Sequence, residues 1–337
     1  MENPYEPARS ILLAENDTAI SGRFTSIDLY GAAVRENGLT DCGDSCFHLE
    51  NESGTGDITL YRVFPGIELV CNDMHMAYCN RHQQPAPHVM EINYCREGRC
   101  ECLFGGNRYC YMSAGDLSFC SLHDSTHQSE FPTSHYHGIT VTIDFSAITA
   151  EMQKVLALLE VDLARVKALS QAKDFTIIRA DATAEHIFSE LYKAPSAIRR
   201  GYIRVKVLEL LLILTGLEAA ANPAKRPSFP AAQIETIKQI RAFLVGHLSE
   251  RHTIGELSAR FDLSPTVLKK CFRGVYGDSV YAYMKKNRLQ AAQRLLRQSC
   301  AAVGEIALQV GYQNPNKFTS AFRAEYGLPP TAYRRKV

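Results

Sequence analysis

The sequence lacks an apolar run long enough to cross a membrane. Its most apolar stretch, residues 205–217, is interrupted by Lys206 and Glu209, whereas a membrane helix needs roughly 18 uncharged apolar residues. The sequence also lacks the positively charged start of a secretory signal, because Glu2 and Glu6 stand there instead. We therefore expect a cytoplasmic protein without a membrane partner.

Strong compositional bias is absent as well. With 337 residues, of which 46% are hydrophobic and 22% charged, the chain resembles an average soluble protein, which excludes collagen, a disordered chain and a small disulfide-stapled scaffold. Its length exceeds what one core of typical size holds, so two or more domains are predicted. The 11 cysteines, nine of them before residue 121, are expected to be free thiols in a reducing compartment.

Charge is distributed unevenly along the chain. Residues 231–337 hold 17 Lys and Arg against 7 Asp and Glu, whereas residues 1–230 hold 20 basic and 29 acidic residues. A basic module attached to an acidic body is typical of a nucleic-acid-binding domain with a separate partner domain. The two parts are joined by residues 222–230, which contain three prolines and predict an interdomain linker.

The basic third contains an internal repeat. Residues 253–277 align with residues 302–327, with one extra residue in the second turn. The coinciding pairs are Gly255/Gly304, Glu256/Glu305, Pro265/Pro315, Phe272/Phe322, Arg273/Arg323, Tyr276/Tyr326 and Gly277/Gly327. Two copies of one supersecondary unit are therefore present.

Each copy predicts two short helices joined by a tight turn. Thr253 and Glu256 form a capping box for the first helix, and Ser264 followed by Pro265 starts the second. Gly277 ends that second helix. Asparagine with proline, and then glycine, take the same places in the second copy. This is the helix-turn-helix arrangement, whose second helix enters a DNA major groove about 12 Å wide.

The apolar stripe of each second helix indicates which face is turned outward. In the first copy, Leu268, Phe272 and Val275 recur at helical spacing and are expected to be buried. Lysine and asparagine on the opposite face can read base edges, and Arg273 and Arg323, later in each helix, are expected to hold phosphates. The predicted DNA-contacting residues are Thr266, Lys269, Lys270, Arg273, Asn316, Lys317, Thr319, Ser320 and Arg323.

The second copy and the residues that follow it, to position 334, resemble a known protein family. The motif GYQNPNKFTSAFRAEYGLPPTAYR at residues 311–334, with the first copy and the helix between them, resembles the DNA-binding domain of the AraC/XylS family of bacterial transcription regulators. The resemblance implies promoter binding, with RNA polymerase as a further partner. It places Thr266, Lys269, Lys270, Asn316, Lys317 and Ser320 at base-contact positions. Ala302 departs from the family, where Ser or Thr is usual, so fraying is expected at the start of that helix.

The acidic body combines strands and helices. Short β-branched or aromatic segments predict strands at residues 58–63, 67–71, 90–95, 99–104, 108–112, 117–120 and 138–143. Many short strands favour a barrel or sandwich, and the family commonly has a cupin-like barrel that binds an effector in this place. Residues 147–221 turn helical, with residues 203–217 apolar on nearly every side, and such helices often pair two subunits in this family.

The histidines and cysteines raise alternatives. His123, His127, His135 and His137 form H-x3-H and H-x-H patterns, but no Glu follows at the cupin-enzyme spacing, so structural or surface histidines are expected and no metal site is predicted. Cys42, Cys46, Cys71 and Cys79 faintly resemble the zinc-cysteine domain of DNA-repair methyl acceptors, although their spacing is wrong for four thiolates. Cys100, Cys102 and Cys110 are expected to be small buried apolar groups.

These observations predict an α+β multidomain protein. Residues 1–146 would form a cupin-like effector-sensing domain, 147–221 a helical dimerisation segment, 222–230 the linker and 231–337 the all-α double helix-turn-helix domain. The predicted function is that of a homodimeric transcription regulator that binds double-stranded promoter DNA and an unidentified small-molecule effector. It would be neither an enzyme nor dependent on a cofactor. The alternative is a methyl-acceptor or metal-dependent enzyme that uses the same DNA-binding domain.

Overall fold

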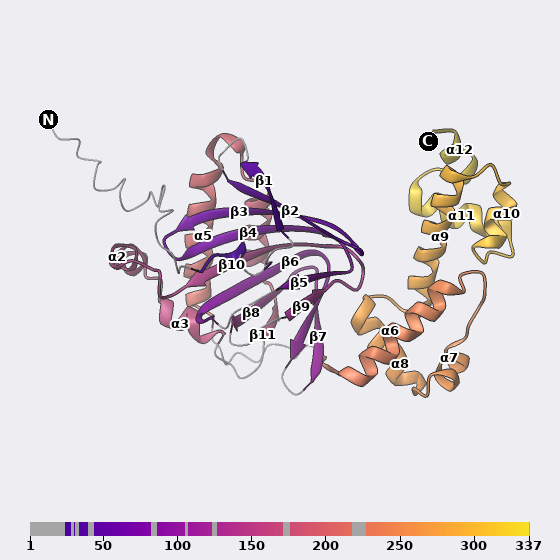
Figure 1. Ribbon diagram of the computed structural model, residues 1–337, viewed down its shortest axis with the longest axis horizontal. Helices are drawn as coiled ribbons and strands as arrows, with labels where there is room; N and C mark the ends of the chain where they lie inside the picture. Colours follow the sequence, from indigo (N-terminus) through magenta and orange to yellow (C-terminus); the bar gives the residue numbers. More distant parts are fainter. Residues whose placement is uncertain are drawn as a thin grey trace. The chain divides into compact units, whose positions relative to one another are not determined.

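The computed structural model describes residues 24–27, 30, 34–39, 44–81, 86–104, 107–122, 127–170, 176–217 and 227–336. The chain divides into two compact units, residues 1–228 and 229–337 (Figure 1). Among the helices of the described residues, none is both long enough and apolar enough to cross a membrane.

The first unit is built on an antiparallel sheet. The strands of this unit are β1 (Val34–Leu39), β2 (Ser45–Asn51), β3 (Gly54–Phe64), β4 (Ile67–His75), β5 (Tyr78–Arg81), β6 (Ala86–Phe104), β7 (Arg108–Ser113), β8 (Asp116–Leu122), β9 (His127–Glu130), β10 (Tyr136–Asp144) and β11 (Thr176–Arg179). They pair in the order β1-β2-β3-β4-β10-β6-β7, with β8 also on β6 and β11 on β8. Strands β5 and β9 form a separate two-stranded ladder.

The strands predicted from the sequence all lie within strands of this sheet. Residues 90–95 and 99–104, predicted as two strands, are one strand, β6, with Gly98 between them at a φ of 82°. A β-carbon at Gly98 would collide with the carbonyl oxygen of His135, so this position needs glycine. Strands β1, β2, β5, β9 and β11 were not predicted.

The predicted cupin-like barrel is not confirmed, because none of the sheets formed by the described residues closes on itself. The ladder starts at β1, whose described pairing is with β2 alone. Short strands separated by turns are compatible with both open and closed sheets. Closure depends on which edge strands meet, and no local pattern encodes that pairing.

The helices of the first unit follow β10 in the chain. They are α2 (Ala150–Leu158), α3 (Leu163–Ala168), α4 (Ala182–Tyr192), the 3₁₀ helix η2 (Ser196–Ile198) and α5 (Arg199–Thr215). The side chains of Thr149, Asp162 and Asp181 accept hydrogen bonds from the first turns of α2, α3 and α4, as good N-caps do. The segment predicted to be wholly helical also contributes strand β11, which pairs with β8.

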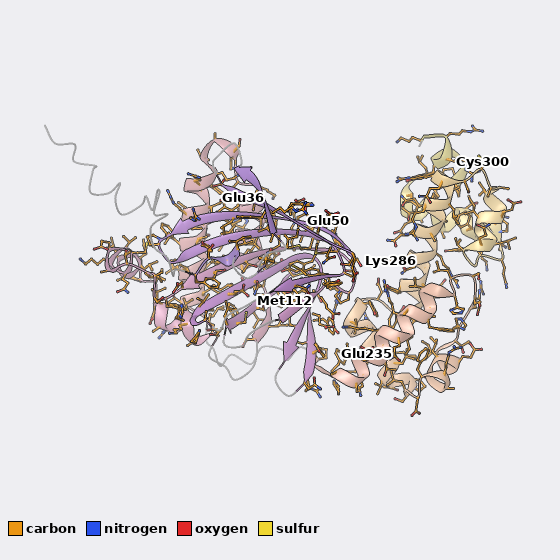
Figure 2. The ribbon with its side chains drawn as sticks, viewed as in Figure 1. Glu36, Glu50, Met112, Glu235, Lys286 and Cys300 are labelled. Carbon is orange, nitrogen blue, oxygen red and sulfur yellow. The ribbon has the colours of Figure 1, made fainter. Side chains whose placement is uncertain are left out.

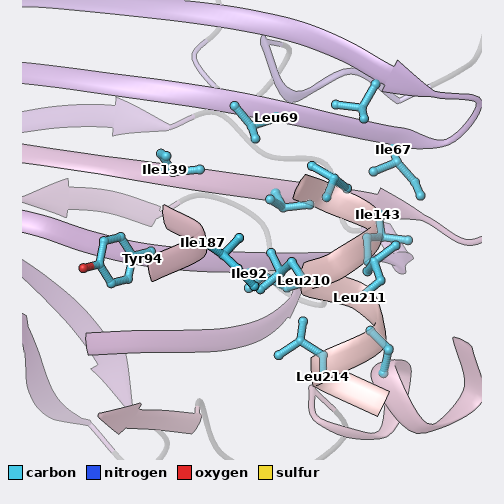
Figure 3. Packing of buried hydrophobic residues seen from close by; sticks show 14 of the residues in the cluster. Ile67, Leu69, Ile92, Tyr94, Ile139, Ile143, Ile187, Leu210, Leu211 and Leu214 are labelled. Carbon is cyan, nitrogen blue, oxygen red and sulfur yellow. The ribbon is translucent and has the colours of Figure 1, made fainter. Parts of the chain in front are cut away.

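Helix α5 covers one face of the sheet. Its residues Leu210, Leu211 and Leu214 belong to one buried cluster with Ile92 and Ile143 of the strands (Figure 3). The prediction that this apolar helix must be covered is therefore satisfied, at least on one side, by the chain's own sheet.

The outer side of α5 keeps two apolar side chains in contact with solvent. Val205 is 63% exposed and Leu212 45%, and their separation of seven residues places them on the same side of the helix.

The second unit is helical. It begins with a two-residue strand, β12 (Phe229–Pro230), and continues with α6 (Ala231–Gly246), α7 (Ile254–Arg260), α8 (Pro265–Tyr276), α9 (Val280–Gln298), α10 (Val303–Gln309), α11 (Pro315–Tyr326) and α12 (Pro330–Lys336). Helix α9 packs against α6 and against α8 of the first copy, and also against α10 and α11 of the second copy and against α12. One long helix therefore holds both copies of the repeat.

Two glycines of the second copy provide a test of its backbone. Gly327 ends α11 at a φ of 74°, whereas Gly304 lies within α10, and a β-carbon at either would meet nothing within 4 Å. Gly327→Ala should destabilise the protein by about 1 kcal/mol, because an L-residue is strained in the left-handed region. Gly304→Ala, the matched control, should stabilise it by about 0.5–1 kcal/mol. Urea unfolding measures both changes, and the same sign for both would contradict this assignment.

Candidate nucleic-acid interface

Helices α7 and α8 form the first helix-turn-helix unit. The Thr253 hydroxyl accepts a hydrogen bond from the Glu256 amide at 3.2 Å, and the Glu256 carboxylate accepts one from the Thr253 amide at 2.8 Å. This is the predicted capping box. Ser264 caps α8 through the Val267 amide at 3.4 Å, and Gly277 ends α8 in the left-handed conformation.

Burial of the apolar stripe decides which face of α8 is exposed. Leu268, Phe272 and Val275 are completely buried, as predicted. The Phe272 ring packs 4.7 Å from Tyr276 and 5.4 Å from Tyr283 of α9, measured between ring centroids. The exposed side chains of α8 include all four predicted contacts, Thr266, Lys269, Lys270 and Arg273.

Helix α11 repeats this arrangement in the second unit. Asn314 caps it by accepting hydrogen bonds from the amides of Asn316 at 2.9 Å and Lys317 at 3.2 Å. Phe318 and Phe322 are completely buried. Of the predicted contacts, Asn316, Lys317, Ser320 and Arg323 are exposed and Thr319 is half-buried.

The repeat extends further than the sequence comparison indicated. Phe322 packs 4.6 Å from Tyr326 and 5.5 Å from Tyr333 of α12, as Phe272 packs on its own two tyrosines. Gln293 of α9 donates to the Tyr333 hydroxyl at 2.8 Å. Each copy thus includes the start of the following helix. The signal was present in the sequence, because Tyr283 and Tyr333 each stand six residues after the glycine that ends a recognition helix.

Arginines fasten the first copy to the helices on either side of it. Arg288 of α9 donates to the backbone carbonyls of Leu248 at 2.9 Å and Glu250 at 2.6 Å, and so fixes the segment that enters α7. Arg241 of α6 donates to the Tyr283 hydroxyl at 2.9 Å. Both arginines are held by hydrogen bonds within the domain, whereas the predicted contacts on α8 and α11 are exposed, apart from the half-buried Thr319.

The unusual start of α10 keeps half of a capping box. Ala302 has no side chain that could accept a hydrogen bond, but the Glu305 carboxylate accepts one from the Ala302 amide at 3.0 Å. The helix begins at Val303, one residue after the expected cap position. The Glu305 bond satisfies one backbone donor at a helix start for which fraying was expected.

In the described part of the chain the metal-competent group contains no cysteine, so the thiols give no support to the methyl-acceptor alternative. Cys42 lies outside the described residues, and Cys46, Cys71 and Cys79 belong to the separate strands β2, β4 and β5. Burial raises the pKa of the Cys71 thiol to about 12, so at neutral pH it is protonated and a poor nucleophile. Cys300, which follows α9, is exposed (Figure 2).

Two of the four histidines singled out from the sequence, His135 and His137, lie close together. A third histidine, His75, which the sequence analysis did not single out, lies beside them. His135 and His137 lie beside His75, with a ring nitrogen of each within 4.8 Å of the others, the one such metal-competent group found in the described part of the chain. Burial lowers the pKa of His137, which favours its neutral form at pH 7. His127 belongs to β9, and His123 lies outside the described residues.

Comparison with known proteins places both units. The family model described as the regulatory protein PchR N-terminal domain matches residues 54–229, just over half of the chain. A helix-turn-helix domain model matches residues 257–336. The crystal structure of the DNA-binding domain of AdpA in complex with a target DNA is 30% identical, and the match covers 30% of this chain and 91% of that domain with a TM-score of 0.29.

Curated relatives match over part of their length. The regulatory protein PchR of Pseudomonas aeruginosa is 35% identical over 96 residues, which are 28% of this chain and 32% of that protein. The right origin-binding protein of Escherichia coli K12 is 29% identical over 103 residues, which are 31% of this chain and 36% of that protein. The chain therefore spans about a third of the length of these relatives. Because the PchR-type model covers more than half of the chain and a helix-turn-helix model matches residues 257–336, this protein belongs to the AraC/XylS family of DNA-binding transcription regulators.

Proposed function

We propose that this protein is a one-component transcription regulator that reads promoter DNA with α8 and α11. The observation that carries the proposal is that α8 and α11 are packed on one helix, α9, and that each buries an apolar stripe and exposes a polar face, which on α8 is mainly basic. Helix α9 has 19 residues, so at about 1.5 Å per residue it is about 28 Å long. That length approaches the roughly 34 to 36 Å between successive major-groove faces of DNA.

The proposed contacts have different roles. Thr266, Lys269 and Lys270 near the start of α8 would read base edges, and Arg273 in its last turn would hold a phosphate. In α11, Asn316, Lys317, Thr319 and Ser320 would take the first role and Arg323 the second. The excess of basic residues in this unit favours association with the phosphate backbone.

The first unit is proposed to sense a small-molecule effector. The face of its sheet opposite to α5 carries a band of hydrogen-bonding side chains within an otherwise apolar core. Asn72 donates to the Thr140 hydroxyl at 3.1 Å, and Thr140 donates to Asn93 at 2.8 Å. Such convergent polar groups can orient a ligand. Effector binding would shift the population of DNA-binding arrangements, with RNA polymerase as the downstream partner in the cytoplasm.

A homodimer is part of the proposal. The exposed apolar side of α5, formed by Val205 and Leu212, supports it, because exposed apolar groups on one helix face favour association. No catalytic role or cofactor is assigned to the chain.

Lysines of α8 provide the test of DNA binding. Lys269→Ala and Lys270→Ala should each weaken binding to a cognate promoter fragment, whereas Arg273→Ala, which removes a proposed phosphate contact, should also flatten the log-log salt dependence by about 0.9. Lys154→Ala, at an exposed lysine of α2 in the first unit, is the matched control and should change neither quantity. Fluorescence anisotropy at several salt concentrations measures both. Unchanged affinity in the two lysine variants, together with an unchanged slope in Arg273→Ala, would show that this face does not bind DNA.

The dimer has its own test. Leu212→Lys should shift the protein toward a monomer of 37.6 kDa, because it places a charge in the proposed apolar contact. Leu308→Lys, at a similarly exposed leucine of α10 in the second unit, should leave the assembly unchanged. Light scattering over a range of concentrations separates the outcomes. A concentration-independent monomer for the unaltered protein would remove the dimer from the proposal.

A further inference from the structure

Three histidines of the first unit lie on one face of neighbouring strands. Strands β4 and β10 pair so that His137 lies opposite Asp73 and Tyr136 opposite Met74. The same antiparallel register, continued by one residue, places His135 across from His75. Side chains two residues apart on a strand share a face, so the three imidazoles and the Asp73 carboxylate project together.

This face is the one that α5 covers further along the sheet. Leu69 of β4 and Ile139 of β10 share it and are buried in the cluster that includes α5, and the same alternation brings Asp73 and His137 to its open end. The neighbouring residues Met74 and Tyr136 are buried on the opposite face. The His75 side chain is 57% exposed, so an ion can reach the cluster from solvent.

The spacing of the imidazoles suits a metal ion better than a hydrogen bond. Nδ1 of His75 lies 3.4 Å from Nδ1 of His135, which is long for a hydrogen bond between nitrogens. In a tetrahedral site with metal–nitrogen bonds of about 2.0–2.1 Å, two ligand nitrogens lie about 3.4 Å apart. One nitrogen of His137 falls within 4.8 Å of the other two rings' ligand atoms.

Carboxylates flank the three rings. Oδ1 of Asp73 lies 2.9 Å from Nε2 of His75 and 2.6 Å from Nε2 of His137, and Oε2 of Glu97 on β6 lies 3.6 Å from Nε2 of His135. Carboxylates hold this position around metal-ligating histidines, where they accept the proton of the nitrogen that does not bind the metal.

One pair in the cluster is left unsatisfied. Oδ1 of Asp73 and Nε2 of His137 are buried atoms, and neither has a hydrogen bond despite their short separation. Buried polar atoms in folded proteins are nearly always satisfied, and an ion at the site is one of the explanations for an exception. A cation that fixes the ring orientations would bring the pair into hydrogen-bonding geometry.

We propose that His75, His135 and His137 bind one divalent first-row transition-metal ion, with Asp73 and Glu97 orienting the imidazoles. Three imidazoles suit Zn²⁺, Co²⁺ or Ni²⁺, whereas Mg²⁺ prefers an all-oxygen octahedral site. The site belongs to the first unit alone and is independent of the DNA-contacting helices, so it adds a metal input to the proposed regulator.

Titration of the full chain with Zn²⁺ after treatment with a chelator is the test. Isothermal calorimetry should give one ion per chain, with no competition from excess Mg²⁺. His75→Asn and His137→Asn should each weaken the affinity at least about tenfold, the scale seen when the surroundings of a metal site are disturbed. His48→Asn is the matched control: His48 lies on β2 of the same sheet, 2.8 Å from the carboxylate of Asp57, and is outside the cluster.

A second measurement distinguishes metal binding by the histidine cluster from metal binding by the cysteines. With Co²⁺ as the probe, ligation by imidazoles should produce no charge-transfer band from thiolate to cobalt. Urea unfolding of each metal-free variant, with the same midpoint as that of the unaltered chain, would show that the fold is intact. The proposal is overturned by the absence of Zn²⁺ binding, by a thiolate band, or by full affinity in His75→Asn and His137→Asn.

Discussion

Burial of two equivalent phenylalanines is the constraint on which the DNA-binding unit depends. Phe272 and Phe322 are completely buried, and each packs on a tyrosine of its own helix and on a second tyrosine of the helix that follows. An aromatic side chain that leaves water in this way stabilises the fold by a few kcal/mol. Rotating either recognition helix about its axis would lose that stabilisation, so the same contact that holds the helix also decides which residues face outward.

The first unit depends on a comparable separation between the two faces of a sheet. Leu69, Ile92 and Val141 point to one face, where α5 completes an apolar core, whereas Asn72, Asn93 and Thr140 point to the other. The face of the sheet that packs on α5 extends beyond that helix. The three histidines lie at the end of this face that α5 does not cover. A sensing role for one face and a metal role for the other are therefore compatible within one sheet.

Local signals predicted the second unit well. The capping box at Thr253, the proline after Ser264 and the left-handed Gly277 act within a few residues of the helix ends that they define, so the pattern alone locates those ends. Strands β1 and β5, in which β-branched residues are sparse, were missed, and so was the β-branched strand β11, because it lies within a segment predicted to be helical. The predicted barrel closure depended on edges far apart in the chain and was not confirmed.

The sequence by itself determined the two helix-turn-helix units, the face that each exposes and the split between an acidic body and a basic module, because capping, helical periodicity and charge are properties of neighbouring residues. Only the tertiary structure decided that the apolar helix α5 lies on the sheet, that each repeat ends in a tyrosine of the next helix, and that His75 meets His135 and His137. His75 and His135 are 60 residues apart, and they meet because β4 and β10 pair in one register. The register depends on the pairing of two strands that are distant in the sequence, so the local sequence of neither strand determines it.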